Sequence, residues 1–175
     1  MPQVECRIAD VGHAKRTADP DEVGELLVRG PIVVNGYYGN PQATTEAIES
    51  DGWLHTGDLA RIDNEGYLYG VDRKRDVILA AGFTIYPAEL ERVISGHPAV
   101  AIVAVGRRSD ELKAEVARAY VVLNNRASAD ENEILGYCRA HLAAYKVPRS
   151  VKFVSDLPKT STGKTMRRLL NTLDT

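Results

Sequence analysis

A short segment near the end of the chain places a lysine among hydroxyl and glycine residues. Thr160-Ser161-Thr162-Gly163-Lys164-Thr165 ends in Gly-Lys-Thr, as does the Walker phosphate loop GxxxxGKS/T, whose backbone amides cradle phosphates. The first glycine of that loop would fall at Pro158, and proline supplies neither the amide nor the conformation. A P-loop NTPase is therefore excluded. A lysine on a flexible loop could still be placed against a carboxylate or a phosphate, and a solvated loop without a role is the alternative.

Two charged residues in the first half of the chain have the chemistry of a nucleotide site. Trp53-Leu54-His55-Thr56-Gly57-Asp58 presents a carboxylate after a glycine. A carboxylate in that setting can accept hydrogen bonds from both hydroxyls of a ribose. Arg73 offers a guanidinium fork for ribose or phosphate oxygens. A turn aspartate and an ordinary surface ion pair remain open as simpler interpretations.

A glycine and a basic segment complete the set of candidates. Gly82 separates two apolar runs and could let a ligand approach the backbone, although a hairpin glycine with positive φ explains it equally well. Between Arg139 and Arg168, eight basic residues are opposed only by Asp156. Such a segment could meet an anionic nucleotide or coenzyme, and a solvated helix face with a basic tail is the alternative.

Composition narrows the class of protein. The chain has 175 residues, 44% of them apolar and 26% charged, which excludes a disordered or collagen-like protein. The formal net charge of −2 predicts no strong attraction to nucleic acid. Cys6 and Cys138 stand far apart, and the four histidines lack metal-type spacing, so neither a disulfide framework nor a metal site is expected. No signal pattern or apolar run of membrane-spanning length is found, which predicts a cytoplasmic protein without a transmembrane segment.

The elements that must position these residues divide the chain into two halves. Residues 4–69 are predicted to form short strands broken by turns, including strands at 25–29 and 32–34 and a short helix at 42–49. This half resembles part of a barrel or sheet whose remainder is missing. The charged residues 72–76 could form a linker to the second half.

The second half is predicted to be a compact α+β domain. Pro87 suits the first position of a helix, and Asp130 suits an N-cap with Glu133 at the third helical position. The predicted elements are, in order, a hairpin at 77–80 and 83–86, a helix at 87–95, strands at 100–105 and 116–123, a helix at 130–141, a strand at 151–154 and a final helix at 164–173.

In their order and spacing, these motifs resemble the adenylate-forming enzymes, which include acyl-CoA synthetases, luciferases and the adenylation domains of peptide synthetases. The segments that carry the resemblance cover nearly the whole chain: they are 24–44, 53–58, 66–91, 142–148 and 157–164. Asp72-Arg73-Lys74-Arg75-Asp76, the Gly82 loop and Pro87-Ala88-Glu89-Leu90-Glu91 look most like the fatty-acyl and medium-chain acyl-CoA ligases.

The resemblance implies an ATP-dependent acid–thiol ligase that works in two half-reactions. A fatty acid and Mg·ATP would form acyl-AMP and pyrophosphate, and coenzyme A would then displace AMP. Roles are implied for six residues: Lys164 as the adenylation lysine, Asp58 and Arg73 in nucleotide binding, Arg75 as a hinge residue where the family usually has Asp or Lys, and Gly82 and Phe83 in the loop beside the pantetheine arm.

The resemblance also implies a domain arrangement. Residues 1–72 would be the last β-barrel piece of a large AMP-binding domain, ending at the hinge, and residues 73–175 a mobile C-terminal lid with a hairpin, a three-stranded sheet and helices. The family's phosphate loop and acyl pocket lie upstream of the matching region, so we expect the chain to need the missing N-terminal large domain as a partner. A non-catalytic module that binds coenzyme A, a carrier protein or a partner subunit is the alternative, and peripheral membrane contact stays open.

Overall fold

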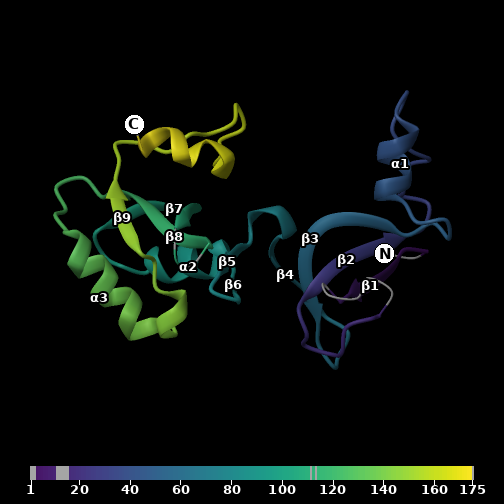
Figure 1. The fold of residues 1–175 in the computed structure, drawn as a ribbon, viewed down its shortest axis with the longest axis horizontal. Coiled ribbons are helices and arrows are strands. Elements are labelled where there is room, and N and C mark those ends of the chain that lie inside the picture. Colours follow the sequence, from purple (N-terminus) through teal and green to yellow (C-terminus); the bar gives the residue numbers. More distant parts are fainter. Residues whose placement is uncertain (1–2, 11–15, 111, 113, 175) are drawn as a thin grey trace. The chain divides into compact units, whose positions relative to one another are not determined.

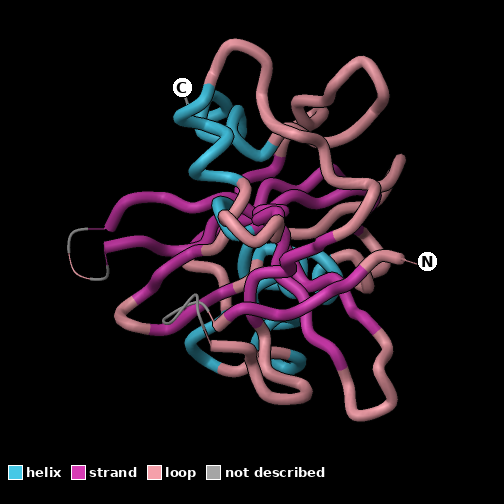
Figure 2. Tube along the Cα trace, turned by 90° about the vertical axis from the view of Figure 1, so that its right-hand side faces the viewer, coloured by secondary structure: helices cyan, strands magenta, loops and turns pink. Residues whose placement is uncertain are grey.

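The structure is a computed structural model that describes residues 3–10, 16–110, 112 and 114–174. The chain folds as two compact units, residues 1–75 and residues 76–175 (Figure 1). Strands, magenta in Figure 2, carry most of the regular structure, and the helices, cyan, are short. The predicted α+β class is confirmed.

The first unit is a four-stranded antiparallel sheet in which each strand pairs with the next along the chain. Its elements are β1 (Glu5–Ala9), β2 (Gly24–Arg29), α1 (Pro41–Ala47), β3 (Leu54–Ile62) and β4 (Leu68–Arg73). The side chain of Asn40 caps α1 by accepting a hydrogen bond from the Ala43 amide. Ala9, Leu27 and Trp53 form a small buried cluster against the sheet.

A β-bulge interrupts the pairing of β2 with β3. Glu25 lies opposite Leu59 and Leu27 lies opposite His55, so residues 56–58 of β3 face only one residue of β2. Gly57 has a φ of +71°, which glycine adopts without a Cβ penalty. Asp58 is the last of these three residues, so the bulge changes the direction in which its side chain points.

The second unit is built on a five-stranded sheet. Its strands are β5 (Ile78–Ala80), β6 (Phe83–Ile85), β7 (Val100–Asp110), β8 (Ala114–Leu123) and β9 (Ser150–Phe153), in the order β6-β5-β8-β7 with β9 parallel to β8. The sequence analysis predicts a hairpin and a three-stranded sheet. In the structure the β5–β6 hairpin joins the sheet of β7, β8 and β9 through a single residue pair, Ala80 with Ala114. The helical elements are α2 (Pro87–Ile94), α3 (Glu131–His141) and the 3₁₀ turns η1 (Lys74–Asp76), η2 (Ala144–Lys146) and η3 (Arg167–Asp174).

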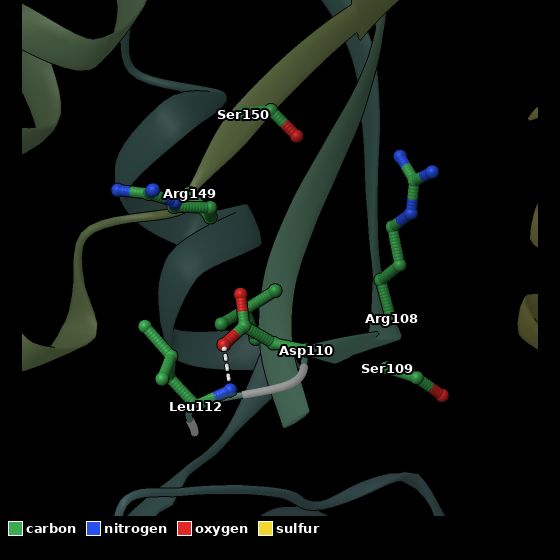
Figure 3. Close-up of a pocket in the computed structure, with 7 residues that line it drawn as sticks. Arg108, Ser109, Asp110, Leu112, Arg149 and Ser150 are labelled. Atoms are coloured by element: carbon green, nitrogen blue, oxygen red, sulfur yellow. Dashed lines mark hydrogen bonds between the residues drawn. The ribbon is translucent and has the colours of Figure 1, made fainter. Parts of the chain in front are cut away.

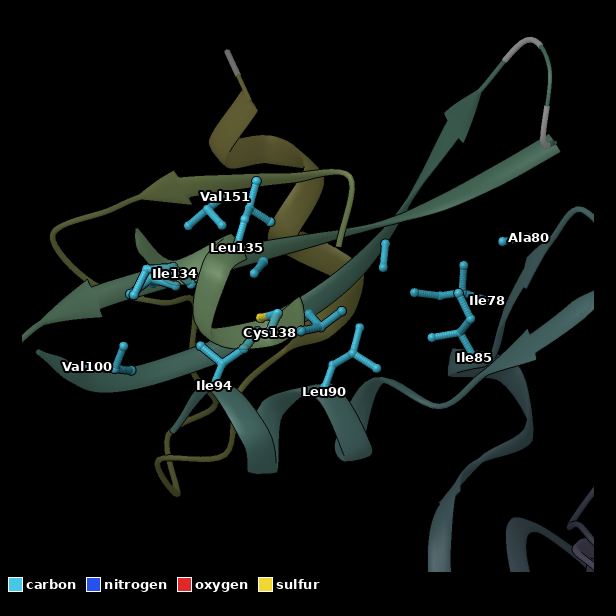
Figure 4. Close-up of a cluster of buried hydrophobic side chains, with 14 residues drawn as sticks. Ile78, Ala80, Ile85, Leu90, Ile94, Val100, Ile134, Leu135, Cys138 and Val151 are labelled. Carbon is cyan, nitrogen blue, oxygen red and sulfur yellow. The ribbon is translucent and has the colours of Figure 1, made fainter. Parts of the chain in front are cut away.

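Both α-helices of this unit lie on one face of the sheet. Leu90 and Ile94, one turn apart on α2, are fully buried, as are Ile134 and Cys138 on α3, and all four belong to the main hydrophobic core (Figure 4). Asp130 caps α3 by accepting a hydrogen bond from the Glu133 amide at 2.9 Å, as the sequence predicts. Pro87 is the first residue of α2, also as predicted.

The opposite face of the sheet is covered by η3. Side chains alternate along β8, so that Ala119 and Val121 enter the main core while Tyr120 points to the other face. There Tyr120 packs in a second cluster with Ala104, Leu157 and Leu170, of which Leu170 belongs to η3. The C-terminal segment is therefore held by its own hydrophobic contacts.

Two predicted elements are wrong. Residues 32–34 form an exposed turn, not a strand, since Gly30 takes a φ of +139° and its carbonyl accepts a hydrogen bond from the Val33 amide. The final helix does not begin at Lys164. Thr165 instead bridges to Lys159, and the helical segment starts at Arg167 and is a 3₁₀ helix. In both cases hydrogen bonds to neighbouring residues outweigh helix or strand propensity.

Candidate functional site

Asp58 and Arg73, predicted to serve one nucleotide, lie side by side. They are paired in the register of β3 and β4, and Arg73 Nε lies 2.9 Å from Asp58 Oδ1. Both side chains are just over 40% exposed. A ligand could therefore reach a carboxylate and a guanidinium at one spot, with Arg73 holding the carboxylate in place.

Thr56 fixes the bulge that carries Asp58, and sequence reasoning missed it. Its hydroxyl donates to the Leu26 carbonyl at 2.7 Å and accepts from the Asp58 amide at 3.1 Å. The sequence feature that could have predicted this role is a hydroxyl residue two positions before the aspartate. Such a residue favours local hydrogen bonds between its side chain and the backbone.

A buried carboxylate on β2 pairs with the residue that follows β4, and sequence reasoning missed this carboxylate too. Glu25 on β2 is only 5% exposed, and its Oε2 lies 2.8 Å from Lys74 Nζ and 3.1 Å from His55 Nδ1. His55 Nε2 in turn lies 3.1 Å from Glu49 Oε1. Burial opposes ionisation of Glu25, but hydrogen bonds from Lys74 and then His55 outweigh it, so the pKa of Glu25 lies below its ordinary value. A carboxyl among apolar strand positions was the available signal.

Lys164 directly follows a tight turn and closes it against Thr160. The Gly163 amide donates to the Thr160 carbonyl at 2.9 Å, and the Thr160 amide donates to the Lys164 carbonyl at 2.8 Å. Gly163 has a φ of +83°, typical of the left-handed residue in such a turn. The Lys164 side chain is exposed, and no described residue pairs with its ammonium. The arrangement presents one cation to solvent on an ordered backbone.

Arg167, three residues further on, ties this segment to α2. Its Nε and Nη2 lie 3.0 Å and 2.6 Å from the two carboxylate oxygens of Glu91, and its Nη1 lies 3.2 Å from Asp76 Oδ2. Glu91 also accepts a hydrogen bond from the Val105 amide at 2.9 Å. A two-point pair of this kind fixes orientation as well as distance. The sequence analysis assigned Arg167 only to the basic segment.

Gly82 and Phe83 lie at the turn of the β5–β6 hairpin. Gly82 has a φ of +83° with open space where a Cβ would stand, so backbone conformation rather than crowding favours glycine. Phe83 is 52% exposed and stacks on Tyr145, which is 44% exposed, with ring centroids 4.6 Å apart. Together the two rings form an apolar surface beside the glycine turn.

The residue after Tyr145 is paired with a carboxylate. Lys146 Nζ lies 2.7 Å and 2.8 Å from the two carboxylate oxygens of Glu89 on α2, and this hydrogen bonding raises the pKa of Lys146. Lys159 likewise pairs with Asp156 at 2.6 Å. Ion pairs within the unit therefore partly neutralise the basic segment. Lys164 differs from Lys146 and Lys159 because no described carboxylate pairs with it.

A hollow of about 420 Å³ lies where β7 and β8 meet the start of β9. None of the six residues with an implied role lines it, although Arg149 of the basic segment does. Its lining residues are Arg108, Ser109, Asp110, Leu112, Val116, Arg149 and Ser150. The two guanidinium groups point to different sides (Figure 3), so they do not converge on a single anion.

Other kinds of site have little support among the residues that the structure describes. Within them, no group of three or more His, Cys, Asp or Glu could hold a metal ion. Burial raises the pKa of the Cys138 thiol, which disfavours a reactive thiolate there. No described helix has the length and hydropathy needed to cross a membrane.

Comparison with known proteins points in one direction. Residues 89–164 match the family described as AMP-binding enzyme C-terminal domain. The chain is 44% identical over 153 residues to the long-chain-fatty-acid–CoA ligase of Bacillus subtilis, covering 87% of this chain and 27% of that protein. It is 45% identical over 150 residues to the 2-succinylbenzoate–CoA ligase of Bacillus cereus, covering 86% of this chain and 30% of that protein.

A solved structure agrees. The crystal structure of ATP-bound MatB from Rhodopseudomonas palustris matches with a TM-score of 0.94 at 32% identity, covering 99% of this chain and 34% of that one. The chain thus spans about a third of the length of the proteins that it matches.

Proposed function

We propose that the chain is the C-terminal portion of an adenylate-forming acyl-CoA synthetase and completes an ATP-dependent acid–thiol ligase. The match of residues 89–164 to the AMP-binding enzyme C-terminal domain and the likeness to acyl-CoA ligases support this proposal. In the first half-reaction a carboxylate oxygen attacks the α-phosphorus of Mg·ATP, and pyrophosphate leaves. In the second, the thiol of coenzyme A attacks the acyl carbonyl, and AMP leaves with the bonding electrons. ATP, its Mg²⁺ and coenzyme A are substrates that the rest of such an enzyme would help to bind.

The exposed ammonium of Lys164 is the observation that carries this proposal. Negative charge builds between the acyl carboxylate and the α-phosphate as the first bond forms. A cation held on an ordered turn, without a described partner to compete, is suited to stabilise that charge. The Arg167–Glu91 pair holds the following segment in place, so the turn is presented from a fixed base.

Asp58 and Arg73 are proposed to bind the nucleotide. Asp58 would accept hydrogen bonds from the ribose hydroxyls, and Arg73 would contact ribose or phosphate oxygens while orienting Asp58. The bulge at Gly57 supports this role because it turns the carboxylate out of the regular strand pattern.

Arg75 is proposed as the hinge, and Gly82 with Phe83 as the surface for the pantetheine arm. Arg75 is the last residue of the first unit, which suits a point at which the units reorient between the half-reactions. The stacked rings of Phe83 and Tyr145 would line the path of a slender chain, and the open space at Gly82 would let it approach the backbone.

The acid is proposed to be a fatty acid, on the likeness to the Bacillus subtilis ligase and on the residue 72–91 motif. Similar proteins also include ligases of other acids, so a panel of acids is the appropriate test. ATP and coenzyme A as substrates, together with the sparse cysteines, support a cytoplasmic location.

The testing experiment measures pyrophosphate release with ATP, Mg²⁺ and acids of different chain length. It compares the chain alone with the chain joined to the large AMP-binding portion of its synthetase. We expect activity only in the joined protein, with loss in Lys164→Ala and retention in Lys159→Ala, a nearby lysine already paired with Asp156.

Lack of turnover in the joined protein, with salt-sensitive binding of coenzyme A or a carrier protein, would instead favour the alternative of a binding module. The basic residues between Arg139 and Arg168 are the observation that favours it.

A further inference from the structure

The backbone between the two units leaves a short span outside any strand. The β3–β4 ladder ends with the pair of Asp58 and Arg73, and the β5–β6 ladder begins with the pair of Ile78 and Ile85. Residues 74–77 lie between these ladders, the first three of them in the 3₁₀ turn η1, and strand pairing alone would allow a change of direction anywhere along them. Two ion pairs, one in each unit, reduce this freedom.

The first ion pair anchors Lys74 to the first unit. Lys74 Nζ lies 2.8 Å from Glu25 Oε2, and Glu25 is 5% exposed on β2. His55 shares the same carboxylate oxygen at 3.1 Å. Because a buried carboxylate that loses a partner retains its desolvation cost, this contact is harder to break than a surface ion pair.

The second ion pair anchors Asp76 to the second unit. Asp76 Oδ2 accepts a hydrogen bond from Arg167 Nη1 at 3.2 Å, and both side chains are more than three-quarters buried. Arg167 is held on its other edge by Glu91 of α2. Val77 then lies between Asp76 and the fully buried Ile78, and so between two residues fixed to the same unit.

We propose that Lys74 and Asp76 are positioning residues that confine reorientation of the two units to the backbone between their α-carbons, with Arg75 at its centre. The inference rests on the proposed function, in which the units change orientation between half-reactions. A rotation before the α-carbon of Lys74 displaces its side chain from Glu25, and a rotation after the α-carbon of Asp76 displaces its side chain from Arg167. Torsions between these two α-carbons, among them both torsions of Arg75, change without breaking either pair.

The arrangement also links the pivot to the adenylation lysine. Arg167, which holds Asp76, lies three residues after Lys164 and holds that segment to α2. Rotation at Arg75 therefore carries the Lys164 turn, α2 and Asp76 together. Without the contact between Asp76 and Arg167, residues 76 and 77 could rotate relative to the rest of the second unit. The same change at the hinge would then move Lys164 over a wider range of positions.

The first test is hydrogen exchange on the 175-residue chain, which needs no activity. The variants are Lys74→Gln and Asp76→Asn, and the second leaves the Arg167–Glu91 pair intact. Matched controls are Glu5→Gln and Asp156→Asn, each of which removes an exposed ion pair elsewhere in the same unit. We expect the amides of residues 74–78 to exchange about threefold faster or more in the two variants and unchanged in the controls. Unchanged exchange at 74–78 would overturn the inference.

The second test separates the half-reactions in the protein joined to its large portion. Acyl-adenylate formation and acyl transfer from supplied acyl-adenylate to coenzyme A are measured for the same variants. We expect the ratio of the two rates to change about threefold or more in Lys74→Gln and Asp76→Asn. A merely structural role would lower both rates by one factor and leave the ratio unchanged, and this would contradict the inference. An inactive unsubstituted protein would contradict the proposed function, while the exchange test would still decide the role of the two pairs.

Discussion

Arg73 Nε lies 2.9 Å from Asp58 Oδ1, across a ladder in which the two residues are directly opposed. The pair joins two sequence motifs that lie on the neighbouring antiparallel strands β3 and β4. Arg73 thereby holds the carboxylate that is proposed to accept hydrogen bonds from ribose, and the proposed binding group is oriented before nucleotide arrives.

Replacing Asp58 by alanine is expected to raise the KM for ATP about tenfold or more in the joined protein. Two hydrogen bonds from ribose hydroxyls to a charged acceptor would be lost, and such bonds contribute roughly 1.5–3 kcal/mol each. The measurement is the rate of pyrophosphate release against ATP concentration. Glu65→Gln, in the exposed turn before β4, is the control and should leave the KM for ATP unchanged. Equal KM values in Asp58→Ala and the unsubstituted protein would remove Asp58 from the site.

Replacing Arg167 by glutamine is expected to lower the free energy of unfolding of the second unit by about 2 kcal/mol. The substitution removes charge-assisted hydrogen bonds to Glu91 and Asp76 and leaves both carboxylates partly buried. Urea denaturation measures this change. Arg168→Gln, at the exposed neighbouring position, should change the same free energy by less than about 0.5 kcal/mol. If Arg167→Gln lowers the free energy of unfolding no more than Arg168→Gln does, the contacts of Arg167 with Glu91 and Asp76 contribute little to stability.

The stability of the first unit is expected to fall in acid through Glu25. The pKa of Glu25 is lowered in the folded state from its ordinary value of 4.5. A lowered carboxyl pKa contributes stability that is fully present above the unfolded-state value and is lost as pH falls through the folded-state value. Denaturation of the chain at pH values from 7 down to about 3 should therefore show a decline that begins near the unfolded-state value. Glu25→Gln should flatten that decline, and an unchanged pH profile would exclude this residue as its source.

Replacing Phe83 by alanine is expected to raise the KM for coenzyme A several-fold without a comparable change in acyl-adenylate formation. The ring stacks on Tyr145 and is half exposed, so its loss removes contact surface for the pantetheine arm but little of the core. Leu79→Ala is the matched control. Leu79 is 58% exposed in the same hairpin, and it lies opposite Thr84 in the β5–β6 register, away from the turn that holds Phe83. An equal effect of the two substitutions on the KM for coenzyme A would argue against a specific aromatic surface.

Local signals account for the elements that were predicted well. Pro87 at the first position of α2, Asp130 at the N-cap of α3 and the glycine turn at Gly82 act within a few residues of themselves. Elements whose ends depend on competing hydrogen bonds were predicted poorly. The segment after Lys164 has the composition of a helix, but pairing of Thr165 with Lys159 delays its start to Arg167.

The sequence by itself determined the family resemblance, the α+β class and the choice of candidate site residues, because these follow from residue type and spacing along the chain. Only the tertiary structure decided which charges meet. Lys74 and Glu25 are 49 positions apart, and Arg167 and Glu91 are 76 positions apart. No local preference specifies such pairs. They form because sheet register and helix packing bring distant side chains together, and burial then makes each charge depend on its partner.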